Sequence, residues 1–275
     1  GNVEEARERF EQLLQEHPSS GLMWYAYAQF EYRLNNNAEL EALFGGALKN
    51  VLDLRLWRLY LQHVRRVNMT VKSDESQMII MKAYEFCLSN IGHDVYSGAT
   101  WLEYVEFVKG LPLPEGDYDK QQRLDQLRKI YHRALQLPLD GLEHIWHSYD
   151  HFETTHNKVA AKKMLSDRSP IYMHCRSLVK ELKDIVDGID RDWIPVKSCQ
   201  EDGEKWQDRM VSWMRWVDWE RQNPAKLDKA IAHHRVLYAF RRALACCNYI
   251  PDLWMALLGY VELAQTASVA TPAGC

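Results

Sequence analysis

Three histidines, His144, His147 and His151, come closer than any other side chains to the spacing of a chemical site. Steps of three and four residues return to one face of an α-helix, so the three imidazoles would lie side by side. Imidazoles arranged in this way can bind zinc. However, the sequence suggests no further ligand, and this face lies roughly opposite Trp146, which we expect to be buried. We therefore interpret the histidines as a solvated helix face and predict no metal site.

Other patterns typical of catalysis or cofactor binding do not occur. The sequence has no glycine-rich phosphate loop, no G-x-S-x-G nucleophile elbow and no H-E-x-x-H motif. Its scattered cysteines form no C-x-x-C pair, which indicates reduced thiols in a cytosolic or nuclear protein. They are Cys87, Cys175, Cys199, Cys246, Cys247 and Cys275. We predict that the chain is not an enzyme, has no catalytic residue and binds no cofactor.

The helices that would carry these side chains are marked by a repeated aromatic pattern, W-x-x-Y-x-x-F-E. Positions i, i+3, i+6 and i+7 fall within about a third of the helix circumference, so each such helix carries one broad aromatic stripe. The pattern occurs six times, with variation in its later positions. The copies begin at Trp24, Trp57, Trp101, Trp146, Trp213 and Trp254.

A second pattern marks the other helix of each repeat. It is an aromatic residue followed, three and four positions later, by a small or apolar residue and a leucine. It begins at Phe10, Phe44, Tyr84, Tyr131 and Phe240. The next tryptophan of the first pattern follows these aromatics after 14, 13, 17, 15 and 14 residues. Five intervals of such similar length indicate a tandem array of helical hairpins.

The repeat predicts an all-α fold, an α-solenoid of antiparallel helix pairs resembling tetratricopeptide (TPR) repeats. A single hairpin cannot bury its aromatic stripe, so neighbouring hairpins must stack to cover it. We therefore interpret the aromatic residues as a buried repeat core, in preference to a stacking platform for nucleic-acid bases. The expected core residues are Trp24, Tyr27, Trp57, Tyr60, Trp101, Tyr104, Trp146, Tyr149, Trp213, Trp216 and Trp254.

Two polar features of the repeat lead to packing predictions. Glu31, Glu153 and Glu220 lie beside the aromatic stripe, so each should be partly buried and need a partner. We predict that this partner is an arginine or a hydroxyl group on a neighbouring helix. Gly45 and Gly46 lie inside a helix, where each glycine costs about 1 kcal/mol relative to alanine. Close packing of a neighbouring element is the expected reason.

The repeat spacing divides the chain into two arrays. We predict an amino-terminal block over residues 1–189, which starts within a helix of the second pattern and ends with a long helix at 157–189. Residues 190–204 lack helical periodicity and are predicted to be a linker. Residues 205–265 would begin a carboxy-terminal block. The small and polar residues 266–275 would form a disordered tail.

Two further predictions concern the long helix and the ends of the chain. Pro170 interrupts the long helical pattern, so it either bends that helix or starts a new one with Ser169 as its N-cap. The sequence opens within one repeat and stops after the first helix of another. We therefore expect the chain to be part of a longer array.

The charge balance limits the choice of partners. The chain has 34 basic and 38 acidic residues, a net charge of -4, whereas a protein that grips nucleic acid is usually basic. No run of 18 apolar residues is present to cross a membrane. The long helix does carry a basic face, which we interpret as solvated, with an acidic partner or RNA as the alternative. Its candidate partner-binding residues are Lys162, Lys163, Arg168 and Arg176.

The paired patterns resemble the HAT (half-a-TPR) repeat of RNA-processing scaffolds. Several stretches also resemble one family, the suppressor-of-forked subunits of cleavage stimulation factor, in the same order along nearly the whole chain. The most specific is Ala161-Lys-Lys-Met-Leu-Ser-Asp-Arg-Ser169. The others are His17-Pro-Ser-Ser-Gly-Leu-Met-Trp24, Leu56-Trp-Arg-Leu-Tyr-Leu-Gln-His-Val-Arg65, Trp101-Leu-Glu-Tyr-Val-Glu-Phe-Val-Lys-Gly110 and Trp219-Glu-Arg-Gln-Asn-Pro224.

This resemblance implies a nuclear scaffold for cleavage and polyadenylation of pre-mRNA 3′ ends. The implied partners are an RNA-recognition-motif subunit, a WD-repeat subunit and the polyadenylation specificity factor. The family also dimerises through its carboxy-terminal HAT block, most of which we expect this chain to lack, and RNA contact would be at most indirect. Two alternatives stay open, a spliceosome scaffold of the crooked-neck type and an RNA-binding repeat protein. The stretch from Ala161 to Ser169 argues against the first alternative.

Overall fold

The computed structural model describes residues 2–69, 73–112, 116–194 and 203–269. Within these ranges the chain forms twelve α-helices and one short 3-10 turn (η1), and no β-strand. The predicted all-α fold is therefore confirmed. The elements are α1 (Val3–Glu16), α2 (Gly21–Arg33), α3 (Asn37–Ala47), α4 (Leu54–Asn68), α5 (Asp74–Ile91), η1 (Val95–Ser97), α6 (Gly98–Lys109), α7 (Asp117–Leu135), α8 (Leu142–His156), α9 (Lys158–Asp187), α10 (Gly203–Arg221), α11 (Lys229–Cys247) and α12 (Pro251–Val269).

Capping side chains fix the starts of several helices, among them α2 and α4. The hydroxyl of Ser20 accepts a hydrogen bond from the amide of Met23, and the carboxylate of Asp53 accepts from the amides of Arg55 and Leu56. Each contact satisfies an amide that the first turn of a helix leaves without a partner, and stabilises the helix by about 1 kcal/mol. These caps set the residue at which α2 and α4 begin, and so keep successive hairpins in register.

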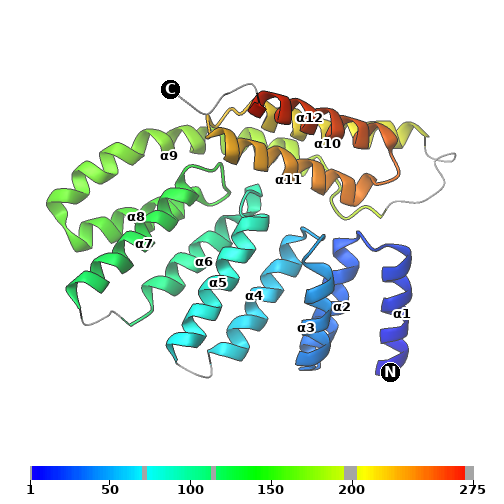
Figure 1. Cartoon of the computed structure of the whole chain (residues 1–275), viewed down its shortest axis with the longest axis horizontal. Coiled ribbons are helices and arrows are strands. Elements are labelled where there is room, and N and C mark those ends of the chain that lie inside the picture. Colours follow the sequence, from blue (N-terminus) through cyan, green and yellow to red (C-terminus); the bar gives the residue numbers. More distant parts are fainter. Residues whose placement is uncertain (1, 70–72, 113–115, 195–202, 270–275) are drawn as a thin grey trace.

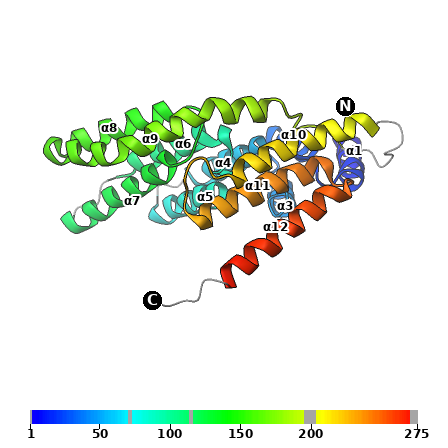
Figure 2. The same cartoon turned by 90° about the horizontal axis from the view of Figure 1, so that it is seen from above.

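Helices α1 to α8 form antiparallel hairpins that stand side by side in a curved row (Figure 1). The helices with the tryptophan pattern are α2, α4, α6 and α8. Seen from above, α4, α6 and α8 lie in one layer and α3, α5 and α7 in the other (Figure 2). Tryptophan-pattern helices also pack on one another across the hairpins, as α2 does on α4 and α6 on α8. This stacking of hairpins is the arrangement of an α-solenoid.

The last four helices change the direction of the chain. α9 runs as one long helix at the far end of the row, and α10, α11 and α12 then return across one edge of it (Figure 1). α11 packs between α10 and α12. It also reaches the turns before α4 and α6, through hydrogen bonds to main-chain oxygens of Leu52 and His93. The carboxy-terminal helices therefore lie on the edge of the row at which those turns are found.

Pro170 lies within α9, which continues without a break from Lys158 to Asp187. The alternative that a new helix starts here, with Ser169 as its N-cap, is therefore wrong. A proline inside a helix removes one main-chain hydrogen bond and costs about 3 kcal/mol. Packing just beyond it offsets this cost, because Tyr172 is buried and stacks on Trp146 with 4.5 Å between ring centroids.

Two predicted limits of non-helical segments are wrong. α10 begins at Gly203, so the end of the predicted linker is helical. α12 continues to Val269, so residues 266–269 of the predicted tail belong to a helix, while 195–202 and 270–275 lie outside the described residues. Extending an existing helix by one residue costs less free energy than starting a new helix, so the small residues 266–269 continue α12. The division into two blocks stays a prediction.

Most residues expected in the repeat core are shielded from solvent. Trp254 differs, since it is 45% exposed. α12 packs on α11, but its outer face is open and also carries the exposed residues Met255 and Leu258. The expected core position of Trp254 is therefore wrong. Among the others, Tyr27, Trp57, Trp101, Tyr104, Tyr149, Trp213 and Trp216 are buried, and Trp24, Tyr60 and Trp146 are half-buried against the core.

Candidate protein-interaction surfaces

Buried ion pairs join the two helices of a hairpin. Arg7 of α1 donates from Nε and Nη2 to the two carboxylate oxygens of Glu31 on α2, at 2.8 and 3.0 Å. Arg128 of α7 makes the same double contact with Glu153 of α8, at 2.6 and 3.0 Å. Two parallel hydrogen bonds to a carboxylate fix the rotation of one helix against the other. The predicted arginine partners of these two glutamates are confirmed.

The third predicted glutamate, Glu220 of α10, pairs with Arg235 of α11 through two bonds of 2.7 Å. Both side chains are almost fully buried. Arg235 uses a further donor, Nη1, to bind the main-chain oxygen of His93 at 3.0 Å. This pair therefore both closes a hairpin and holds α11 on the amino-terminal row.

A second buried arginine of α11 makes a similar contact. Arg242 donates from Nη1 to the main-chain oxygen of Leu52 at 2.7 Å, across a sequence distance of 190 residues. Burying a guanidinium is costly unless its donors find acceptors, and the Nε of Arg242 finds none among the described residues, so the contact with Leu52 is needed to offset that cost. Arg235 and Arg242 were not predicted from the sequence as junction residues. The available signal was weak, because the same stretch of α11 also carries the exposed Arg241.

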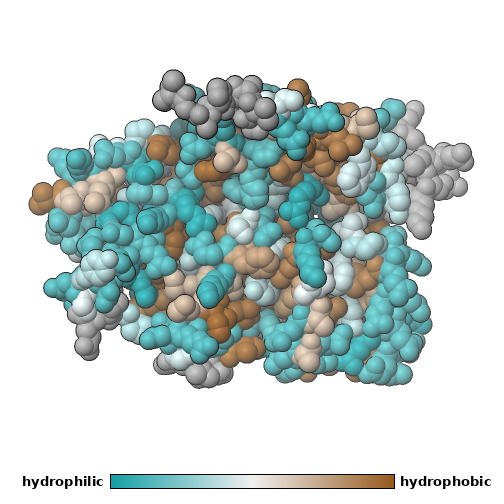
Figure 3. Space-filling view, viewed as in Figure 1, coloured by the Kyte–Doolittle hydropathy of each residue, from teal (hydrophilic) through white to brown (hydrophobic). Residues whose placement is uncertain are grey.

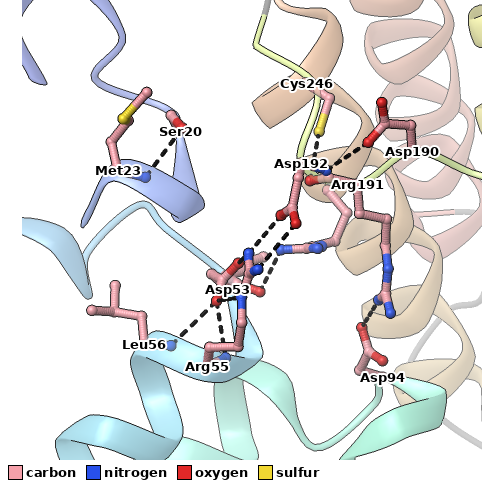
Figure 4. A network of polar contacts seen from close by, with 12 residues as sticks. Ser20, Met23, Asp53, Arg55, Leu56, Asp94, Asp190, Arg191, Asp192 and Cys246 are labelled. Atoms are coloured by element: carbon pink, nitrogen blue, oxygen red, sulfur yellow. Dashed lines mark hydrogen bonds and ion pairs between the residues drawn. The ribbon is translucent and has the colours of Figure 1, made fainter. Parts of the chain in front are cut away.

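Asp94 joins the residues after α9 and helix α11 to the row, and Figure 4 shows its contact with Arg191. Its fully buried carboxylate accepts hydrogen bonds from Arg191 at 3.0 Å and from the hydroxyl of Tyr238 at 2.8 Å. The same side chain caps η1 through the amide of Tyr96. Burial raises the pKa of Tyr238, and the charge of Asp94 raises it further, so the phenol stays protonated and donates.

The residues just after α9 are held on the row by a second arginine bridge (Figure 4). Arg55 of α4 contacts Asp53 at 2.7 Å and Asp192 at 2.5 and 3.0 Å. Burial acts to raise the pKa of Asp53, but the hydrogen bond from Arg55 and the charge of Arg242 outweigh it, so the pKa is lowered. The described part of the predicted linker is thus fastened to the row.

The four basic residues expected to bind a partner do not form one patch. Lys162 and Lys163 are exposed on α9. Arg168 is half-buried near His132, whose pKa is lowered to about 4 by burial and, to a smaller extent, by this arginine. Arg176 is paired at 3.1 Å with a carboxylate of α8. At 100° per residue the four positions spread around the helix. Their role in partner binding stays a prediction.

The three histidines that are spaced like metal ligands do not meet further ligands in the described part of the chain. His144, His147 and His151 are exposed on α8. Across the part of the chain that the structure describes, no three His, Cys, Asp or Glu side chains are grouped to hold a metal ion. Cys87, Cys175, Cys246 and Cys247 are buried, and burial raises the pKa of each thiol, to about 11 for Cys175 and Cys246.

Two of the open grooves on the surface have apolar linings. One, about 860 Å³, lies between α4 and α6 and is lined by Met69, Ile80, Leu102 and Phe107. The other, about 430 Å³, lies between α3 and α5. Both have the volume of typical binding sites. No helix within the described ranges is long and apolar enough to span a bilayer.

A curved row of helical hairpins, held by buried aromatic stripes and arginine–glutamate pairs, defines a helical-repeat protein of the solenoid class. The family model for the suppressor of forked protein matches residues 1–272. The chain therefore belongs to the suppressor-of-forked family, as the sequence resemblance predicted.

Relatives named for mRNA 3′-end processing match most of the chain. The protein rna14 of Schizosaccharomyces pombe is 33% identical over 263 residues, covering 93% of this chain and 34% of the relative. The rna14 protein of Aspergillus fumigatus is 36% identical over 260 residues, covering 90% and 25%. Cleavage stimulation factor subunit 77 of Arabidopsis thaliana is 32% identical over 252 residues, covering 92% and 34%. This chain thus spans about a third or less of the length of these relatives.

A solved structure has the same fold. The crystal structure of CSTF-77 superposes with a TM-score of 0.69 at 24% sequence identity, covering 90% of this chain and 49% of that chain. The solenoid described above is therefore the fold of that protein as well.

Proposed function

We propose that this chain is part of a nuclear scaffold subunit that organises the cleavage and polyadenylation of pre-mRNA 3′ ends. The observation that carries the proposal is the family match over residues 1–272, together with relatives named for mRNA 3′-end processing. The fold supports it, because a solenoid offers a long surface on which several proteins can dock. The role is one of docking, without catalysis.

The proposed partners are other subunits of the same machinery. They are a subunit with an RNA-recognition motif, a WD-repeat subunit and the polyadenylation specificity factor, and a second copy would join through the carboxy-terminal HAT block. The net charge of -4 favours protein partners over direct binding of RNA, which depends on neutralising phosphates with Lys and Arg.

Affinity purification from nuclear extract tests this function. The tagged chain and a tag-only control are incubated with extract treated with ribonuclease, and the bound proteins are quantified by mass spectrometry. We expect cleavage and polyadenylation subunits to be enriched over the control. Enrichment of spliceosomal proteins instead would assign the chain to the crooked-neck type of scaffold and overturn the proposal.

Direct binding of RNA by the chain is tested separately. In a filter-binding titration with single-stranded RNA, we expect little binding at physiological salt. Tight binding that weakens steeply as salt rises would indicate many phosphate contacts. That result would show the chain to be an RNA-binding repeat protein and contradict the proposed role in docking proteins.

A further inference from the structure

The groove between α3 and α5 has an apolar lining that is open to solvent. Its floor includes Tyr60 and Val64 of α4, and its walls include Phe44 of α3 and Ile79 and Phe86 of α5. The last two residues are 42% and 45% exposed. Figure 3 shows apolar side chains gathered over this part of the molecule, between α3 and α5. Apolar side chains collected in a hollow are typical of an interaction site.

Gly45 lies in the last turn of α3 and lines the same groove. A Cβ built on Gly45 would meet no atom within 4 Å, whereas one on Gly46 would meet Trp24 at 3.5 Å. The expectation that a neighbouring element explains both glycines is therefore wrong for Gly45. A glycine destabilises a helix relative to alanine, and nothing in the described chain requires one at this position. The missing side chain opens the groove to a closely approaching partner.

The main chain around the groove points to a helical occupant. α3, α4 and α5 use their amide and carbonyl groups within their own helices, so the groove wall offers no main-chain partners as a sheet edge would. An extended peptide on this apolar floor would leave its own polar groups unpaired, which is costly. A helix satisfies these groups internally and can bury an apolar face.

Charged side chains at the two ends of the groove set the direction of that helix. Glu41 lies within α3 and Lys49 lies in the turn just after α3 ends at Ala47, and both side chains are exposed and line the groove. The imidazole of His63 lies 3.4 Å from the carboxylate of Glu41. Because burial lowers the pKa of His63, its neutral ring does not compensate the charge of Glu41. A helix typically carries acidic residues in its first turn and basic residues in its last. Its start therefore fits beside Lys49 and its end beside Glu41.

We propose that the groove bounded by Glu41, Gly45 and Lys49 binds an amphipathic helix of a partner protein, antiparallel to α3. The bound helix spans about three turns, presents apolar side chains at i, i+3, i+4 and i+7, and is acidic at its start and basic at its end. We take this partner to be another subunit of the 3′-end processing machinery, which rests on the proposed function.

A peptide titration tests the groove itself. The probe is a fluorescent, stapled helical peptide of about three turns with this apolar face and charge order, and its binding to the chain is followed by anisotropy. We expect Gly45→Leu, which fills the groove, and Ile79→Lys, which charges its wall, each to weaken binding about tenfold or more. Met78→Lys is the matched control, because Met78 is 55% exposed but lies outside the groove lining.

The outcomes separate the binding mode from alternatives. We expect a peptide with its charges exchanged end to end, and one broken by a central proline, to bind more weakly. The inference would be overturned if the chain bound these peptides as tightly as the original peptide. It would also be overturned if Gly45→Leu bound the original peptide as tightly as the unchanged chain does. If Gly45→Leu unfolds at the same temperature as the unchanged chain or at a higher one, misfolding is excluded as the cause of lost binding.

The same variant links the groove to the machinery. In the nuclear-extract experiment, we expect Gly45→Leu to lose one protein that the unchanged chain and Met78→Lys both enrich. If the unchanged chain enriches 3′-end processing subunits and Gly45→Leu retains them all, the inference is wrong while the proposed function stands. If the unchanged chain enriches none, the proposed function fails, and the inferred partner fails with it, while the titration still decides whether the groove binds a helix.

Discussion

The indole nitrogen of Trp57 donates a hydrogen bond to the main-chain oxygen of Val51, 2.8 Å away and six residues earlier. Trp24 and Trp254 make the same contact at 2.9 Å, again with the oxygen six residues before them. The tryptophan of the repeat therefore closes the turn that leads into its own helix, besides filling the core. Only an aromatic ring with an N–H donor can do both, which explains why tryptophan occupies the position even where, as at Trp254, it is exposed.

Trp57→Phe should lower the free energy of unfolding by about 1 to 3 kcal/mol, because the buried oxygen of Val51 loses its donor. Urea unfolding measures this change. Trp254→Phe serves as the control, since water can replace the indole at an exposed site, and its effect should stay within about 0.5 kcal/mol. If both variants lost the same free energy of unfolding, the smaller ring and not the lost hydrogen bond would account for the effect.

Glu220→Gln should cost about 3 to 5 kcal/mol, because Arg235 would keep a buried charge without its partner. The comparison is Glu143→Gln, whose partner Arg176 is half-exposed, as is Glu143 itself. Breaking such a surface pair should cost at most about 1 kcal/mol. Chemical denaturation of both variants checks the difference, and a small effect of Glu220→Gln would contradict the structural role given to the pair.

His93 should make the chain less stable in mild acid. Burial, helped by the charge of Arg235, lowers the pKa of His93 to about 3, against about 6.5 in an unfolded chain. Between these values the unfolded state binds a proton that the folded state does not, so stability falls as pH falls. By about pH 5 the loss reaches about 2 kcal/mol.

Unfolding free energies measured at about pH 7 and pH 5 test this prediction. His93→Gln should show a smaller loss on acidification than the unchanged chain. His147→Gln, at an exposed position on α8, should leave the loss as it is. The same pH dependence in His93→Gln and in the unchanged chain would rule out His93 as its source.

Two glycines should respond to alanine in opposite ways. Gly45→Ala should stabilise the fold by up to about 1 kcal/mol, because the methyl group meets no atom and improves helix propensity. Gly98→Ala should destabilise it, since a Cβ there would lie 2.0 Å from the main-chain oxygen of Asp140. Thermal unfolding of the pair gives the signs. A destabilised Gly45→Ala would mean that the open space at α3 is needed by the fold itself.

Arg242→Met should loosen the junction between α11 and the row, because the oxygen of Leu52 loses its donor. Hydrogen exchange of the amides around Leu52 and along α11 should become faster. The neighbouring Arg241 is exposed, so Arg241→Met should leave these rates unchanged. Equal exchange in the two variants would show that the contact between Arg242 and Leu52 is not needed to hold α11 in place.

Periodicity was sufficient to predict the hairpins and the burial of the glutamates beside the aromatic stripe. A glutamate such as Glu31 in that position must be desolvated, so its need for an arginine or a hydroxyl partner follows from position alone, while the choice of arginine does not. The contact between Arg242 and Leu52 could not be predicted in this way. It spans 190 residues and uses a main-chain acceptor, which carries no side-chain pattern. For Trp254 the pattern was present, but no helix among the described residues covers that face of α12, and repeat spacing does not report coverage.

The acceptors that α11 finds on the row are main-chain oxygens, those of Leu52 and His93. Every amino acid supplies such an oxygen, so a substitution of Leu52 or His93 keeps the acceptor, whereas one extra residue in either turn would carry the oxygen out of reach. Growth of the protein by added segments should therefore be confined to the opposite edge of the row. The junction thus fixes the length of the chain along one edge of the molecule.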